Sequence, residues 1–249
     1  MNIENVSEIA LTAGTILLEN GAETYRIEKT ISSICDAYGI EAECLAISNG
    51  VILSIKGEDS KCITSMKKVD NRNIDLYRIE LINSFSRNLK KTPLTFDEAK
   101  QVLDDIKNAP NFNLPVRIAA SCMTGFIYTL FFNGSIADGI CSIVICLFTY
   151  ILIDKLSKLG LFQFTEYYIA GAVIGFASLF ASMSFSYISE RNVITGSIMI
   201  VLPGVLLTNG IKDVIYGHFS SGISDFFRAI VIIAAIAAGV GTALFFRIR

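Results

Sequence analysis

The pattern of apolar and polar positions changes near residue 114. Before that point, apolar residues recur at helical or alternating spacing among many charges, and after it they form long runs. Helical spacing of apolar residues over 4–20 and 22–38 predicts two amphipathic helices. Gly21 and Gly39 are predicted to end them, because glycine adopts the left-handed conformation at little cost.

The next stretch has a period of two instead. In residues 43–57, ECLAISNGVILSIKG, apolar positions alternate on both sides of Asn49-Gly50, a dipeptide suited to a two-residue hairpin turn. The elements predicted after this hairpin are a strand at 61–68 and helices at 72–90 and 95–107. The last helix starts with Thr95 and Glu98, the spacing of a capping box.

The second part of the chain has the pattern of membrane helices. A helix that crosses a bilayer needs about 20 mostly apolar residues. Spans are predicted near 116–133, 136–153, 167–187, 192–211 and 226–246. The predicted fold is therefore an α-helical integral membrane protein, in which a small α+β cytoplasmic domain (1–114) precedes a transmembrane helical domain (115–249) of about five transmembrane helices. Gly171 and Gly175 have the spacing that lets two membrane helices approach closely.

Composition and charge agree with this division. The chain is 52% hydrophobic with a mean hydropathy of +0.54, and 30 of its 44 charged residues precede residue 115. The N-terminus lacks the basic and apolar regions of a secretory signal, so the first domain is expected in the cytoplasm of a cell-membrane protein. Lys155 and Lys158 support this orientation, whereas Arg247 and Arg249 leave the direction of the last span open.

Several classes of function are disfavoured. No basic tract indicates nucleic acid. The single histidine and the six scattered cysteines predict no metal site, and no cofactor is expected. The chain has no phosphate-binding glycine loop or nucleophile elbow, so we expect no enzyme, and any transport should be secondary or passive.

Three stretches resemble the bacterial threonine/serine exporter family. They are ENGAETYRIEKTISSICDAYGI at 19–40, FFNGSIADG at 131–139 and VLPGVLLTNGIKDVIYGHFSSGIS at 201–224. The last is the most specific, because it combines Pro-Gly, Thr-Asn, Lys-Asp and Ser-Gly in one order. The resemblance covers nearly the whole chain.

The resemblance implies a function and a partner. The family occurs as long chains with about ten spans or as pairs of shorter proteins, and this chain resembles the N-terminal part. It therefore implies a second small hydrophobic membrane subunit in an oligomer within the lipid membrane. The implied substrate is a small molecule: threonine, serine, or a dicarboxylate such as succinate. The alternatives are a scaffold or regulator of a separate permease, and a membrane-bound hydrolase.

The candidate transport residues lie mainly in the last of these stretches. Pro203 and Gly204 interrupt the predicted fourth span, and broken helices in transporters direct their positive N-terminal ends at anionic substrates. The alternative is a packing kink. Thr208 and Asn209 follow one turn later and can donate and accept hydrogen bonds, and solvation at the end of the span is the alternative.

Two acids are candidates for coupling. Asp213, which follows the fourth span, and Asp138, at the start of the second, could carry a proton or bind an ammonium group. The alternative is that both acids mark helix ends in water.

Charged residues of the soluble domain form a second candidate group. Glu23 and Arg26 share a helix face, and with Glu28 they are candidates for a gate or docking contact at the cytoplasmic mouth. A local surface ion pair is the alternative. His218, the only histidine, is expected in a solvated loop, with pH sensing as the alternative.

Overall fold

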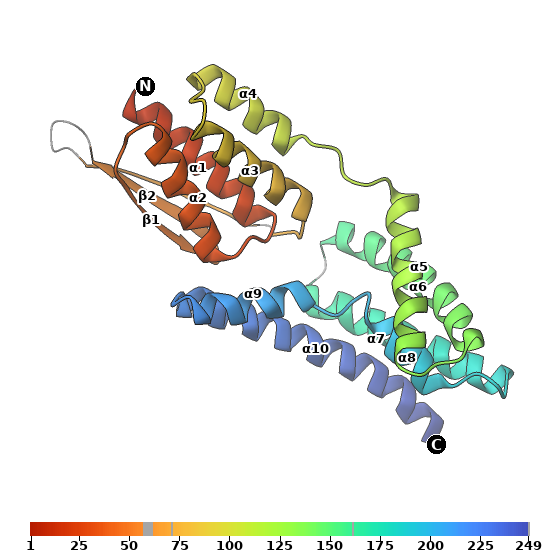
Figure 1. Cartoon of the computed structure of the whole chain (residues 1–249). Coiled ribbons are helices and arrows are strands. Elements are labelled where there is room, and N and C mark those ends of the chain that lie inside the picture. Colours follow the sequence, from red (N-terminus) through yellow and green to blue (C-terminus); the bar gives the residue numbers. More distant parts are fainter. Residues whose placement is uncertain (57–61, 71, 161, 249) are drawn as a thin grey trace. The chain divides into compact units, whose positions relative to one another are not determined.

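The computed structural model describes residues 1–56, 62–70, 72–160 and 162–248. The chain is mostly helical and contains a three-stranded sheet (Figure 1). It divides into two compact units, each of which is assembled from two separate segments. One unit comprises Met1–Pro110 and Val205–Phe227, and the other comprises Asn111–Gly204 and Arg228–Arg249.

The first unit begins with two helices packed on an antiparallel sheet of order β1-β2-β3. The elements are α1 (Ile3–Glu19), α2 (Thr24–Ala37), β1 (Ala42–Ile47), β2 (Gly50–Lys56) and β3 (Cys62–Lys68). The predicted helices at 4–20 and 22–38 are confirmed. Gly21 and Gly39 have φ angles of 81° and 70°, as expected of residues that follow helix ends.

The predicted hairpin is confirmed, but its turn lies one residue earlier than expected. Ile47 pairs with Gly50, so the two turn residues are Ser48 and Asn49. Gly50 is the first residue of β2, and it also pairs with Lys68 of β3. A Cβ atom at Gly50 would lie 3.0 Å from the carbonyl oxygen of Lys67, so this glycine permits close strand pairing rather than a turn.

Two further helices pack on α1 and α2: α3 (Leu76–Leu89) and α4 (Phe96–Lys107). The helix predicted at 72–90 starts later, because the Asp75 carboxylate caps α3 by accepting the amide hydrogens of Tyr77 and Arg78. The capping box of Thr95 and Glu98 is confirmed. Gly57 and Lys61, at the ends of the predicted hairpin and third strand, lie outside the described residues.

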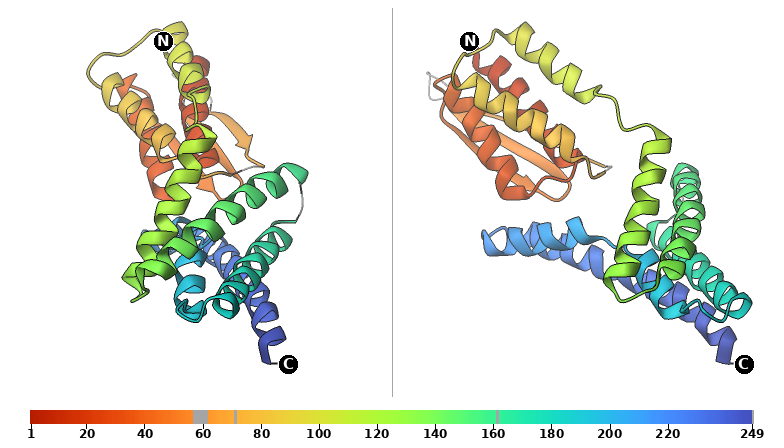
Figure 2. Two further views of the ribbon diagram at one scale, coloured as in Figure 1. Left: turned by 90° about the vertical axis from the view of Figure 1, so that its right-hand side faces the viewer. Right: turned by 45° about the vertical axis from the view of Figure 1, so that its right-hand side comes forward.

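A helical hairpin completes the first unit. It consists of α9 (Gly204–Ile215) and the first residues of α10 (Phe219–Ile248), joined at Gly217, whose φ angle is 91°. A Cβ atom at Gly210 would lie 2.9 Å from the carbonyl oxygen of Gly222, so only small residues allow this helix contact. Figure 2 shows α9 beside the start of α10.

The second unit contains long apolar helices. They are α5 (Leu114–Phe131), α6 (Ile136–Leu156), α7 (Gln163–Ser184), the short α8 (Glu190–Ile198) and the remainder of α10. Helices α7 and α10 approach closely at the predicted glycine pair. Cβ atoms at Gly171 and Gly175 would lie 2.5 Å from the Ile236 carbonyl oxygen and 2.7 Å from the Ala243 Cβ.

Four helices of the described residues are long and apolar enough to cross a membrane: Leu114–Phe131, Ile136–Leu159, Gln163–Ser184 and Phe219–Arg247. The span predicted near 192–211 is not among these four helices, because it is divided into two shorter helices. Helix α8 ends at Ile198 and α9 starts at Gly204. Pro203 has no amide hydrogen, so a regular helix cannot run through this position without losing a backbone hydrogen bond.

Candidate functional site

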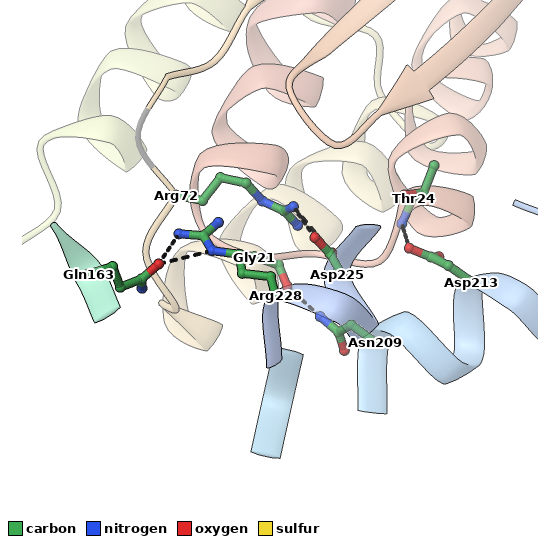
Figure 3. Close-up of polar contacts among 8 residues, drawn as sticks. All are labelled: Gly21, Thr24, Arg72, Gln163, Asn209, Asp213, Asp225 and Arg228. Carbon is green, nitrogen blue, oxygen red and sulfur yellow. Dashed lines mark hydrogen bonds and ion pairs between the residues drawn. The ribbon is translucent and has the colours of Figure 1, made fainter. Parts of the chain in front are cut away.

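The first unit brings together two stretches that are far apart in the sequence, the start of α2 and the inner face of α9. The side-chain amide of Asn209 donates to the Gly21 carbonyl at 2.8 Å, and the Thr24 amide donates to Asp213 Oδ2 at 3.2 Å (Figure 3). We call this region the α2–α9 contact, comprising Gly21, Glu23, Thr24, Asn209, Lys212 and Asp213.

Asp213 is a buried acid with an incomplete set of hydrogen bonds. Its exposed fraction is 1%, and Oδ1 has no hydrogen-bond partner within the described parts of the chain. Burial raises the pKa of Asp213 above its usual value, although the amides at the start of α2 and the nearby His218 act in the opposite direction. The carboxyl group therefore takes up a proton more readily than an ordinary aspartate.

Glu23 lies in the same contact and has close cations. Its carboxylate forms ion pairs with Lys212 at 3.0 Å and with Arg26 at 3.1 Å. Burial alone would raise the pKa of Glu23, but a backbone hydrogen bond and the two cations outweigh it, and the pKa is lowered. The pKa values of Glu23 and Asp213 are thus shifted in opposite directions within one contact.

The other soluble-domain candidates lie close by. Glu28 Oε1 accepts the Ala46 amide hydrogen at 2.9 Å, and Oε2 lies 3.6 Å from His218 Nε2. The rings of Tyr25 and Tyr216 stack with centroids 4.1 Å apart. Glu23 and Glu28 thus both contact residues of the α9–α10 hairpin, as a docking contact requires.

A buried ion pair near this contact does not follow from the sequence. Arg72 Nη1 donates to both carboxylate oxygens of Asp225, at 2.9 and 3.2 Å (Figure 3). The side chains are only 11% and 4% exposed. Asp225 is one of only six acidic residues after residue 114, and this rarity could have identified it as a candidate from the sequence. Arg72 lies among many charged residues, so nothing in the sequence distinguishes it.

The remaining candidates of the 201–224 stretch are arranged differently. Gly204 is the first residue of α9 and Pro203 precedes it directly. The Thr208 hydroxyl donates to the Val205 carbonyl at 3.0 Å, and Thr208 is exposed, whereas Asn209 is buried. Only Asn209 and Asp213 of this stretch's candidates therefore belong to the α2–α9 contact.

Asp138 belongs to the second unit and has a full set of partners. It is 2% exposed and accepts the amide hydrogens of Ser135 at 2.9 Å and Ser189 at 2.7 Å, with Asn192 Nδ2 at 3.4 Å. These bonds join the loop before α6 to the start of α8. Asp138 thus lies at a helix end, as the alternative states, but it is buried and hydrogen-bonded rather than exposed to water.

The α2–α9 contact contains two acids with different partners: Asp213 Oδ1 has none among the described residues, and Glu23 pairs with two cations. Among the described residues, no three His, Cys, Asp or Glu side chains cluster so as to hold a metal ion. Protonation of Asp213 would remove a buried charge from the start of α2 without disturbing the Glu23–Lys212 pair. The contact between the soluble domain and the hairpin could thus change with proton occupancy.

Comparisons with known proteins cover almost the whole chain. Residues 8–247 match the sequence model of a family described as "Putative threonine/serine exporter". A "Threonine/serine exporter" of Corynebacterium glutamicum is 21% identical over 96% of this chain, which spans only about half, 50%, of that relative's length. Two further relatives, from Klebsiella aerogenes and Escherichia coli, are each named "Probable succinate transporter subunit YjjP". They are 20% and 19% identical to this chain, respectively. Each match covers 96% of this chain and 93% of the relative. No solved structure gives a significant match.

Proposed function

Because the chain belongs to the threonine/serine exporter family, we propose that it is one subunit of a secondary transporter that exports small amino acids or small organic acids. The observation that carries the proposal is the family match over residues 8–247, which includes all four apolar helices. The relatives are named as transporters rather than enzymes. Threonine, serine and succinate all bear a carboxylate, and this shared group defines the proposed substrate class.

We further propose five membrane crossings, with α8 and the first residues of α9 forming one broken span. Glu190 at the start of α8 forms an ion pair with Arg247 near the end of α10. Helix α9 runs back beside the start of α10, where Gly210 lies against Gly222 and Phe226. The apolar residues 192–211 are divided between α8 and α9, which supports one crossing in two parts that ends before Asp213.

The proposed orientation places residues 1–114 in the cytoplasm as a separate α+β domain. Arg117 pairs with Asp154 at 3.4 Å, and Arg228 donates to Gln163 at 3.1 and 3.0 Å. Asp154 also pairs with Lys158. Asp154 and Gln163 lie near the end of α6 and at the start of α7, so their basic partners gather beside the loop between these two helices. Basic residues are enriched on the cytoplasmic side.

A second membrane subunit is part of the proposal. The Corynebacterium relative is about twice as long as this chain, and the two relatives of similar length are named subunits. A separate, mostly hydrophobic protein would supply the portion that the long relative carries in one chain.

Within this subunit we assign proton coupling to Asp213. The carboxyl group is buried, its pKa is raised, and it lies where the soluble domain meets α9. Pro203 and Gly204 stand at the start of α9, and this N-terminal end is the proposed site for the substrate carboxylate. Glu23, Arg26 and Glu28 form the proposed cytoplasmic gate.

Reconstitution tests the function directly. The chain is placed in liposomes with and without a candidate second subunit, and efflux of labelled threonine, serine and succinate is followed under an imposed pH gradient. We expect efflux of at least one substrate only when both proteins are present. Efflux by the chain alone would exclude an obligatory partner, and no efflux of any of the three by the pair would overturn the proposed substrate class.

A further inference from the structure

The α9–α10 hairpin has two chemically different faces. Asn209, Asp213, Ser221 and Asp225 are buried on the face that binds the soluble domain. Large apolar side chains, spaced by four residues, lie on the other face, where their exposed fractions range from 44% to 74%. They are Ile211, Ile215, Phe219, Ile223 and Phe227, and we call them the apolar hairpin face.

Helix geometry explains how the two faces are separated. Two residues along an α-helix correspond to a rotation of about 200°, so Ile211 and Ile215 point away from Asn209 and Asp213. The same relation separates Ile223 from Asp225. Because Gly210 and Gly222 hold the two helices close together, the exposed side chains of both helices form one continuous surface.

The length of α10 indicates what this surface contacts. The apolar segment Phe219–Arg247 has 29 residues and is about 44 Å long, whereas the hydrocarbon core of a bilayer is about 30 Å thick. Residues 228–247 alone are long enough to cross it. We assign the excess length of the helix to the N-terminal end of α10, because Asp225 at that end forms an ion pair with Arg72 of the soluble domain.

Arg228 marks the membrane boundary on this helix. Its guanidinium group donates two hydrogen bonds to Gln163, the first residue of α7, so two apolar helices reach the same level at this point. Long basic side chains at such positions place their charge in the headgroup layer. Phe227 then lies just outside the hydrocarbon core, and Ile223 and Phe219 lie progressively further out.

We propose that the apolar hairpin face binds the interfacial layer of the lipid bilayer, at the boundary between headgroups and acyl chains. The continuity of this face with the membrane-crossing part of α10 favours lipid as its occupant over a second protein. The hairpin thus holds the soluble domain by its polar face and the membrane surface by its apolar face.

Tryptophan fluorescence can test this placement, because the natural chain contains no tryptophan. Phe227→Trp, Ile223→Trp and Phe219→Trp each introduce a single fluorophore into the full chain. Each variant is reconstituted in phosphatidylcholine vesicles that carry bromine either near the headgroup end or near the methyl end of the acyl chains. We expect stronger quenching by the shallow bromine than by the deep bromine for all three, with Phe227→Trp quenched most.

Two control variants set the limits of the measurement. Val231→Trp, on the exposed side of α10 beyond Arg228, should be quenched more by the deep bromine than the three test variants are. Met66→Trp, on the exposed outer face of β3, should not be quenched by either lipid. If the three hairpin tryptophans behaved like Met66→Trp, water or protein rather than lipid would cover the face. Deep quenching equal to that of Val231→Trp would place the hairpin within the hydrocarbon core, and either result would overturn the proposal.

Discussion

Asp213 and Glu23 lie in one contact but should respond to pH in opposite ways. The pKa of Asp213 is raised, so its contribution to stability is complete below the unfolded-state value and is lost as the pH rises through the higher folded-state value. The pKa of Glu23 is lowered, so its contribution is present above the unfolded-state value and is lost as the pH falls through the lower folded-state value. Both contributions are present together only near the ordinary pKa values of the two groups, so the contact should be firmest at about pH 4.

The first prediction concerns the role of Asp213 in coupling. Asp213→Asn keeps the shape of the side chain but cannot exchange a proton. We expect it to abolish proton-driven efflux and to spare counterflow exchange, which requires binding without net proton movement. Asp138→Asn is the matched control and should have a milder effect. If the Asp213→Asn variant kept pH-dependent efflux, the coupling residue would have to lie elsewhere, for example in the partner subunit.

The second prediction concerns the Glu23–Lys212 ion pair. Lys212 is 49% exposed but Glu23 only 8%, so the coupling energy should reach the upper part of the range for surface pairs, about 1 kcal/mol. A double-mutant cycle with Glu23→Gln and Lys212→Met, measured by thermal unfolding in detergent, would give this value. The Glu8–Lys100 pair, with 54% and 52% exposure, is the control and should give a coupling near zero. Equal values for the two pairs would argue against a specific docking role for Glu23.

At the level of single residues, the sequence identifies members of the contact but not their partners. Asn209 and Asp213 are polar residues close to a predicted span, and Glu23 and Glu28 lie in the stretch at 19–40 that resembles the family. Their pairing depends on contacts between positions nearly 190 residues apart, as in the bond from Thr24 to Asp213. Local spacing carries no information about such distances, which is why only the structure shows the partners.

At the level of elements, periodicity predicts most helices and strands, and fails where the chain changes direction within an apolar run. Residues 192–211 are apolar enough for one span, yet helical structure stops at Ile198 and resumes at Gly204. Hydropathy averages over such a break. Pro203 predicts that the helix is interrupted. It does not predict that the residues before it form a separate turn, in which the Leu202 amide donates to the Ile198 carbonyl.

The third prediction tests whether this break has a function. Pro203→Ala restores a backbone amide and should let α9 extend toward α8, which would alter the N-terminal end proposed to bind the substrate carboxylate. We expect expression to survive and efflux to fall. Efflux is measured in liposomes at matched protein content, and circular dichroism reports any gain in helix. Unchanged efflux by a well-folded variant would identify the break as a packing feature.

The fourth prediction concerns the contact between α7 and α10. A Cβ atom at Gly171 would lie 2.5 Å from the Ile236 carbonyl oxygen, so Gly171→Ala requires the backbones to separate. We expect a loss of about 1–3 kcal/mol, which is typical of overpacking. Gly241→Ala on α10 is the control, since no atom lies within 4 Å of the position that its Cβ would occupy, and it should leave the unfolding temperature in detergent nearly unchanged. Equal stability of the two variants would contradict the close contact.

At the level of the whole molecule, the sequence separates polar from apolar segments but does not show which segments pack together. Residues 205–227 follow three long apolar helices, yet they form a compact unit with the first 110 residues. Composition indicates whether a segment lies in water or in lipid. Which segments pack together depends instead on whether the surfaces of their helices complement each other. Here the polar face of the α9–α10 hairpin, rather than its average hydropathy, determines its partner.

The last prediction concerns the side of the membrane on which the soluble domain lies, and native cysteines can test it. Cys62 is exposed on β3, whereas burial raises the pKa values of Cys35 and Cys44 to about 12 and keeps their thiols unreactive at neutral pH. A membrane-impermeable maleimide should therefore label Cys62 in lysed cells but not in intact cells if the domain is cytoplasmic. Cys62→Ser should remove the signal that appears on lysis, which assigns it to this residue. Labelling of Cys62 in intact cells would reverse the proposed orientation, and with it the assignment of the α2–α9 contact to the cytoplasmic mouth.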